Sequence, residues 1–192
     1  MTNLADGRSI QDVILLDSIG AAFGTSNPLP SVGLTTRPTA TFSRPADTTA
    51  YASGDLVANS VTAGSVVPLQ FTVARVAAGS GMIRRVRVRK TGTSVTSALF
   101  RLHLYNVSPT ASNGDNGAWL TNQSTEYVGS LDVTLDKAFT DGAAGNGLPT
   151  IGYEINFKLP SGTVLYGLLE ARGAYTPASG ETFLVELEVL QN

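Results

Sequence analysis

The sequence predicts an all-β fold: a β-sandwich or jelly-roll-like domain of about eight antiparallel strands behind an extended N-terminal arm. From about residue 47 onward, apolar and polar residues alternate in short runs that are separated by clusters of Gly, Asn, Asp, Ser and Pro. Apolar residues make up 42% of the 192 residues, and 20 Gly and 9 Pro provide the many turns typical of β-rich proteins. This length suits one domain, so we assign residues 1–46 to the arm and residues 47–192 to the sandwich.

The arm differs in composition from the rest of the chain. Residues 24–45 are rich in Gly, Thr, Ser and Pro, and four prolines punctuate them: Pro28, Pro30, Pro38 and Pro45. Each proline fixes its own φ angle and moves the preceding residue out of the helical region. We therefore expect this segment to be extended.

One strongly apolar patch precedes the prolines, formed by Val13, Ile14, Leu15 and Leu16. A free tail would leave this patch in water, where an exposed apolar cluster is unfavourable. An arm that docks on another surface would cover it. Both alternatives are open, and we favour docking, which makes these four residues candidates for a protein interface.

The strands of the sandwich are expected near residues 55–62, 68–77, 82–90, 97–106, 127–136, 152–159, 163–172 and 182–190. Alternation is clear in the third, where Val86 and Val88 alternate with arginines, and in the fourth, where Phe100, Leu102 and Leu104 alternate with polar residues. Such strands bury one face and leave the other in water. Eight of them favour a sandwich over an open sheet.

Turn signals set the expected connections. Pro160, Ser161 and Gly162 form a compact turn, so we expect residues 152–159 and 163–172 to pair as an antiparallel hairpin. Residues 107–126 and 137–151 are rich in Gly, Asn and Asp, and we expect two long loops there. Loops of this length are usually functional or ordered by a neighbouring molecule.

The densest charge feature is the basic stretch at residues 84–90. Alternation places Arg85, Arg87 and Arg89 on one face of the strand. These arginines could form ion pairs with Glu186 and Glu188, meet an acidic protein surface, or bind phosphates. Aromatic residues are not interleaved with them as they are on base-stacking sheets, which argues against nucleic acid.

The sequence gives little indication of a catalytic site. His103 is the single histidine, and there is no cysteine. Alternation places His103 on the outer face between Arg101 and Tyr105, where a positive charge disfavours the imidazolium that a general base must become. We expect an ordinary surface or interface histidine, and a protein that is not an enzyme and carries no cofactor.

Two features of residues 107–126 could bind small ligands. Residues 113–117, Asn-Gly-Asp-Asn-Gly, loosely resemble a calcium loop but lack its spaced acidic ligands, and the same residues form ordinary turns. Trp119, the single tryptophan, could stack on a sugar with the help of Tyr127 and Tyr175. Alternatively, it is a buried aromatic that anchors its loop, and we include it among the candidate interface residues.

Overall charge and hydropathy narrow the possible partners. The formal net charge is −2, so no strong field attracts the chain to nucleic acid or an anionic membrane. Charged residues make up 15% of the chain against a usual value of about 25%, which is consistent with a surface partly covered by partners. No apolar run is long enough to span a membrane, and the first residues lack the features of a signal peptide, so we expect a soluble protein made in a cytoplasm.

Several stretches resemble small virion proteins of tailed bacteriophages. They are residues 51–90, residues 100–105, the loop at 112–118, and residues 153–191, about three quarters of the chain. Residues 24–30 are also similar to short arms of phage structural proteins. The resemblance implies a structural protein of the virion, usually a head decoration, or cement, protein, and it carries no catalytic motif.

The resemblance also implies partners and a location. The expected partner is the major capsid protein, with a homo-oligomer or contacts between neighbouring copies on the head lattice. The protein would be made in the cytoplasm of the host bacterium and located on the outer surface of the capsid. The alternative is a structural component of the tail, neck or baseplate, with or without recognition of host-surface glycan.

Overall fold

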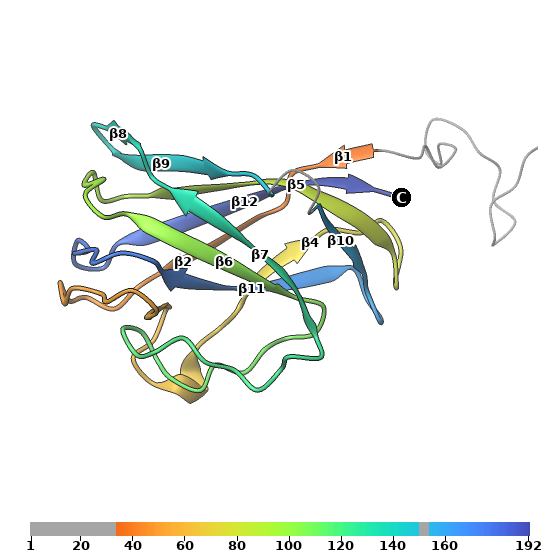
Figure 1. Cartoon of the computed structure of the whole chain (residues 1–192), viewed down its shortest axis with the longest axis horizontal. Helices are drawn as coiled ribbons and strands as arrows, with labels where there is room; N and C mark the ends of the chain where they lie inside the picture. The colour runs from red at the N-terminus through yellow and green to blue at the C-terminus, as the bar shows by residue number, and fades with distance from the viewer. Residues whose placement is uncertain (1–33, 150–153) are drawn as a thin grey trace, which may run out of the picture. The chain divides into compact units, whose positions relative to one another are not determined.

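The computed structural model describes residues 34–149 and 154–192, and it is all-β. The described residues form twelve strands and one short 3-10 turn, η1 (Ala63–Ser65). The strands make two antiparallel sheets packed face to face, which confirms the predicted β-sandwich (Figure 1). All twelve strands belong to one compact unit, Gly33–Asn192.

The seven-stranded sheet is built around two long central strands, β5 (Ser80–Lys90) and β12 (Thr182–Gln191). The other edge of β12 pairs with β1 (Leu34–Thr36) and β2 (Thr39–Ser43). The other edge of β5 pairs with β9 (Gly142–Gly147) and β10 (Ile155–Lys158), and β8 (Lys137–Phe139) lies beyond β9.

The five-stranded sheet has β11 (Val164–Ala171) and β6 (Leu99–Tyr105) at its centre. The short strands β3 (Leu56–Val57) and β4 (Leu69–Thr72) share the free edge of β11. The last strand, β7 (Tyr127–Thr134), pairs with β6.

The main core lies between the two sheets and follows the alternation in the sequence. On β12, the buried residues alternate with half-buried ones along the whole strand. Three phenylalanine rings meet in this core. Phe183 stacks on Phe42 with centroids 5.4 Å apart and meets Phe100 edge-on at the same distance. Fully burying such a side chain contributes about 1.5–3 kcal/mol, so the sandwich is held mainly by this layer.

A β-bulge changes the parity of β5. Arg85 pairs with Glu188, but the next partner of β12 is Ile83, so Arg84 has no partner on β12. The extra residue allows Ile83 and Val86 both to face the core, three positions apart. The bulge therefore brings Arg84 and Arg85 side by side at the surface.

The predicted boundary between arm and domain is wrong by about a dozen residues. We placed residues 1–46 in the arm, but β1 and β2 pair with β12 and are strands of the sandwich. The prediction treated the prolines as evidence against strands. Pro38, however, lies between the two short strands, where its missing N–H does not interrupt a ladder. Residues 1–33 lie outside the described residues.

The predicted hairpin is also wrong. Residues 155–158 pair with β5 in one sheet, whereas residues 164–171 pair with strands of the other sheet. The turn at Pro160–Gly162 therefore carries the chain across the core. Gly162 adopts a φ of 59°, which favours glycine, but a reversal of the chain does not determine whether the flanking strands pair or separate.

Two further expectations need correction. Residues 137–151 are not one long loop, because β8 and β9 form a hairpin there. The strand expected at 55–62 is reduced to two residues in β3, and the segment after it is irregular up to β4. Residues 107–126 contain no strand and form the expected long loop.

Candidate functional site

The basic row on β5 consists of Arg84, Arg85, Arg87 and Arg89. The last three face outward as alternation predicted, and Arg85 and Arg87 lie opposite glutamates of β12. Arg85 pairs with Glu188, and Arg87 lies in register with Glu186. The Nη2 atom of Arg85 is 2.8 Å from Oε2 of Glu188, and Nη2 of Arg89 is 3.7 Å from Oδ2 of Asp141. Internal ion pairing therefore accounts for two of the three arginines.

Arg87, the third of these arginines, and the nearby Arg84 have exposed side chains. Among the residues that the structure describes, Arg84 and Arg87 make no ion pair within 4 Å. Half-buried apolar residues lie on the same outer face, Met82 on β5 and Leu184 on β12. The outer face of the seven-stranded sheet thus combines positive charge with apolar area on a rigid support.

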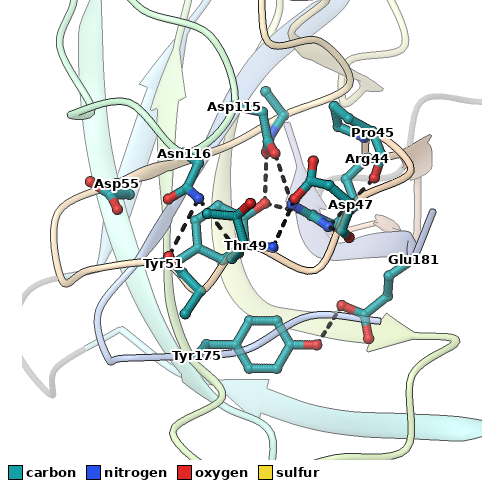
Figure 2. Close-up of polar contacts among 12 residues, drawn as sticks. Arg44, Pro45, Asp47, Thr49, Tyr51, Asp55, Asp115, Asn116, Tyr175 and Glu181 are labelled. Atoms are coloured by element: carbon teal, nitrogen blue, oxygen red, sulfur yellow. Dashed lines mark hydrogen bonds and ion pairs between the residues drawn. The ribbon is translucent and has the colours of Figure 1, made fainter. Parts of the chain in front are cut away.

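A buried polar cluster closes one end of the sandwich (Figure 2). Nη2 of Arg44 donates to Oδ2 of Asp115 at 3.0 Å, and both side chains are almost fully buried. Tyr51 donates its hydroxyl hydrogen to Oδ1 of Asp115 at 2.6 Å and accepts from Nε of Arg44 at 2.7 Å. The backbone N–H of Ala58 donates to the same Oδ1 at 2.8 Å.

A second buried ion pair lies beside the first. Nζ of Lys90 donates to Oε1 of Glu181 at 2.9 Å, and Tyr175 donates to the other carboxylate oxygen. The rings of Tyr175 and Tyr51 stack with centroids 6.3 Å apart, which joins the two clusters (Figure 2). Burial raises the pKa of both tyrosines, so their hydroxyl groups stay protonated and act as donors.

The hydrogen bonds of Asp115 explain the role of residues 113–117, the loop that loosely resembles a calcium site. Both oxygens of Asp115 accept hydrogen bonds from protein donors, and the carboxylate points inward (Figure 2). Within residues 34–149 and 154–192, no group of three or more His, Cys, Asp or Glu side chains could hold a metal ion. Residues 113–117 thus form a turn that inserts Asp115 into the domain.

We expected a surface or interface histidine, but His103 is buried within its own domain. It lies on the outer face of the five-stranded sheet but is only 5% exposed, because the loop at 107–126 covers it. Trp119 of this loop stacks on the imidazole, with ring centroids 3.8 Å apart. Alternation identified the correct face, and the error was to equate that face with solvent.

The imidazole is held by two partners. Nε2 of His103 is 2.7 Å from Oε2 of Glu170, and Nδ1 is 3.4 Å from the hydroxyl oxygen of Tyr127. Burial lowers the pKa of His103 below its ordinary value of 6.5, although the hydrogen bond with Glu170 acts in the opposite direction. The nearby charges of Arg101 and Arg172 lower it further. The neutral ring then donates to Glu170 and accepts from Tyr127.

A carboxylate, a hydroxyl group and an indole ring surround the imidazole of His103. Ser130 lies opposite His103 in the sheet, but no hydrogen bond joins their side chains among the described residues. Both ring nitrogens are occupied and one ring face is covered by Trp119. The arrangement instead ties the long loop to β6, β7 and β11.

The candidate interface residues do not form one site. Arg85, Arg87 and Arg89 lie on the seven-stranded sheet, whereas Trp119 packs against the outer face of the other sheet. Tyr127 lies near Trp119, but Tyr175 belongs to the main core. Val13, Ile14, Leu15 and Leu16 lie outside the described residues.

The sequence analysis did not identify several residues of these clusters. Lys90 shares its parity with Val86 and Val88, so alternation alone could have placed it in the core and required a buried acidic partner. Asp115 and Glu170 gave no such signal, because their partners lie 71 and 67 positions away in the sequence.

Two comparisons of the chain with known proteins found no match. No protein-family model matches it. No curated protein matches it either. In the part of the chain that the structure describes, no helix has the length and hydropathy needed to cross a membrane.

Proposed function

We propose that this protein is a non-enzymatic decoration, or cement, protein of a tailed-phage head, and that it attaches to the outside of the capsid lattice. The resemblance to phage virion proteins supports the setting. The outer face of the seven-stranded sheet supports the mode of attachment. The major capsid protein is the partner, and neighbouring copies of the chain contact one another on the lattice.

The observation that carries the proposal is the exposed positive charge of the basic row, in which Arg87 makes no ion pair in the described part of the chain although Glu186 lies opposite it. Arg84 and Arg87 are exposed on a rigid strand and make no ion pair with described residues. Met82 and Leu184 add apolar area on the same face. Positive charge around apolar contacts is suited to an acidic protein surface, where it speeds association and sets orientation.

Attachment to a lattice stabilises the lattice by mass action. A protein that binds only the assembled state shifts the equilibrium toward it. An interface of roughly 1,200–2,000 Å² is sufficient for specific attachment, and contacts between neighbouring copies add avidity.

Particle binding tests the proposal directly. The full chain is compared with the double variant Arg84→Glu/Arg87→Glu for binding to heads stripped of the native protein. We expect the variant to bind at least about tenfold more weakly, with a weaker dependence on salt. The single variants Arg87→Glu and Arg75→Glu form a matched pair, because they make the same charge change on β5 and at an exposed position outside the strands. Equal loss in both variants would reject the basic row as the attachment site.

Copy number separates the proposal from its alternative. A decoration protein should be present in purified virions in a number comparable with that of the major capsid protein. A tail, neck or baseplate component should be present at a small fraction of that number. Quantitative mass spectrometry of virions measures this ratio.

A further inference from the structure

A pocket of about 220 Å³ lies on the outer side of the five-stranded sheet, away from the basic row. The long loop forms one wall and the ends of β6 and β7 form the other. Six residues line the pocket: Tyr105, Trp119, Thr121, Gln123, Ser124 and Tyr127. None of them is charged, and three are aromatic.

Two residues that line the pocket carry a buried polar atom that has no partner within the described ranges. In the described part of the chain, two buried side-chain atoms lack a hydrogen-bond partner, the hydroxyl oxygen of Tyr105 and Nε1 of Trp119. Both residues line this pocket, and Tyr105 is 1% exposed. Buried polar groups in native proteins nearly always have partners, so two exceptions at one place point to a partner that the free chain lacks. Each atom exposes less than 1 Å², so a ligand contacts it only after a small rotation of the side chain.

The chemistry of the lining defines the ligand. Burial raises the pKa of Tyr105, so its hydroxyl group stays protonated, and Nε1 of Trp119 can only donate. Gln123 uses its side-chain oxygen to accept from Thr110 and Thr121, which leaves its amide nitrogen without a protein partner among the described residues. The pocket therefore offers several donors to a ligand rich in neutral oxygen acceptors.

The aromatic residues provide a stacking surface. Tyr127 is 40% exposed and meets Tyr105 edge-on, with centroids 5.5 Å apart. His103 supports Trp119 from behind, which fixes the indole at the pocket. Pockets for drug-sized ligands measure roughly 300–1,000 Å³, so this smaller one suits a single ring.

We propose that this pocket binds one neutral pyranose ring of a saccharide. The C–H face of the sugar lies against the aromatic rings, and its hydroxyl oxygens accept hydrogen bonds from Tyr105, Trp119 and Gln123. The uncharged lining disfavours phosphorylated or acidic ligands. The site is independent of the lattice contact proposed above, because it lies on the other sheet.

The single tryptophan makes the test direct, because fluorescence excited at a wavelength that tyrosine does not absorb reports on Trp119 alone. Glucose, galactose, mannose and N-acetylglucosamine are titrated separately, with adenosine as a flat heteroaromatic probe. We expect at least one sugar to change the fluorescence with a Kd on the order of 1 mM, as suits a single ring. No lattice or particle is present, so failure here would leave the capsid proposal untouched.

Two variants assign the binding to the pocket. Tyr127→Ala removes the stacking surface and should weaken sugar binding by about tenfold. Tyr105→Phe removes only the unpartnered hydroxyl and should weaken it about threefold to tenfold, while the thermal midpoint stays the same or rises. A merely structural hydroxyl would give the opposite pattern, with a lower midpoint and unchanged affinity.

The matched control is Tyr166→Phe, the same deletion on β11 at a residue that does not line the pocket. It should bind sugar like the unaltered chain. The proposal is overturned if no sugar changes the fluorescence, or if the change persists in both pocket variants. Binding of adenosine without any sugar would assign the pocket to a nucleic-acid base and also overturn it.

Discussion

At the residue scale, the single histidine provides a probe of the packing under the long loop. His103 is buried against Glu170 and Trp119, with Arg101, Arg172 and Tyr127 as the other titratable groups near it. We expect its pKa, measured by NMR titration of the one imidazole, to lie below 6.5. A value at or above 6.5 would mean that the imidazole is not desolvated.

This lowered pKa has a consequence for stability. As the pH falls through 6.5, the unfolded chain takes up the histidine proton before the folded chain does. The free energy of unfolding should therefore be highest above about pH 6.5 and decline as the pH falls toward the folded-state pKa. Denaturant unfolding at several pH values measures this decline, and His103→Gln should flatten it.

The buried ion pair of Arg44 and Asp115 allows a second prediction. Asp115→Ala leaves the buried Arg44 with the more exposed Asp47, 3.3 Å away, as its remaining anionic partner. The loss of the buried carboxylate should lower the free energy of unfolding by about 3 kcal/mol. The same substitution at Asp132, in an exposed pair with Arg101, should cost at most about 1 kcal/mol. Chemical denaturation of both variants measures the difference, and equal costs would contradict it.

At the scale of elements, the hairpin of β8 and β9 depends on glycine. A Cβ atom on Gly145 would lie 2.0 Å from the carbonyl oxygen of Thr134, so the backbones of β9 and β7 approach too closely for any side chain. Gly145→Ala should cost about 1–3 kcal/mol because the strands must move apart. Gly64→Ala, where nothing lies within 4 Å, is the control and should change stability by less than about 0.5 kcal/mol. Thermal and denaturant unfolding provide the measurement.

The same hairpin shows where sequence patterns stop being informative. Alternation correctly predicted the faces of β5, β6, β7 and β12, since each of these strands has the core on one side. In β9 the pattern is absent, because close backbone contact selects Gly and Ala on both faces. The composition of such a strand is therefore that of a loop.

The candidate site was predictable only in part, for a related reason. Alternation placed Arg87 and His103 on outer faces, and this was correct for both. It could not show that a loop covers one of these faces and not the other. Coverage depends on contacts such as that of Trp119 with His103, which no periodicity encodes.

At the scale of the whole molecule, the observed boundary changes how the arm must be tested. Deleting residues 1–46 would remove β1, β2 and Arg44, and Asp115 would then be buried without its cation. Such a variant should unfold at a much lower temperature whatever the arm does. Deleting residues 1–33 keeps every described strand and isolates the contribution of Val13 to Leu16.

We expect the chain lacking residues 1–33 to keep its thermal midpoint and to bind stripped heads more weakly than the full chain. The aliphatic patch would contribute about 25 cal/mol for each Å² of apolar area that it covers on a neighbouring subunit. Calorimetry and particle sedimentation measure the two properties. A lower midpoint with unchanged particle binding would show that the patch braces its own domain.

The position of β12 governs the order in which the chain can fold. β12 comes last in sequence among the described strands, yet it lies between β5 and the pair of β1 and β2. During synthesis, β1, β2 and one edge of β5 must wait for β12 to leave the ribosome before these ladders can form, whereas the other edge of β5 can pair earlier with β9 and β10. The nascent chain therefore carries open strand edges for most of its translation, and chains that terminate early are prone to aggregate.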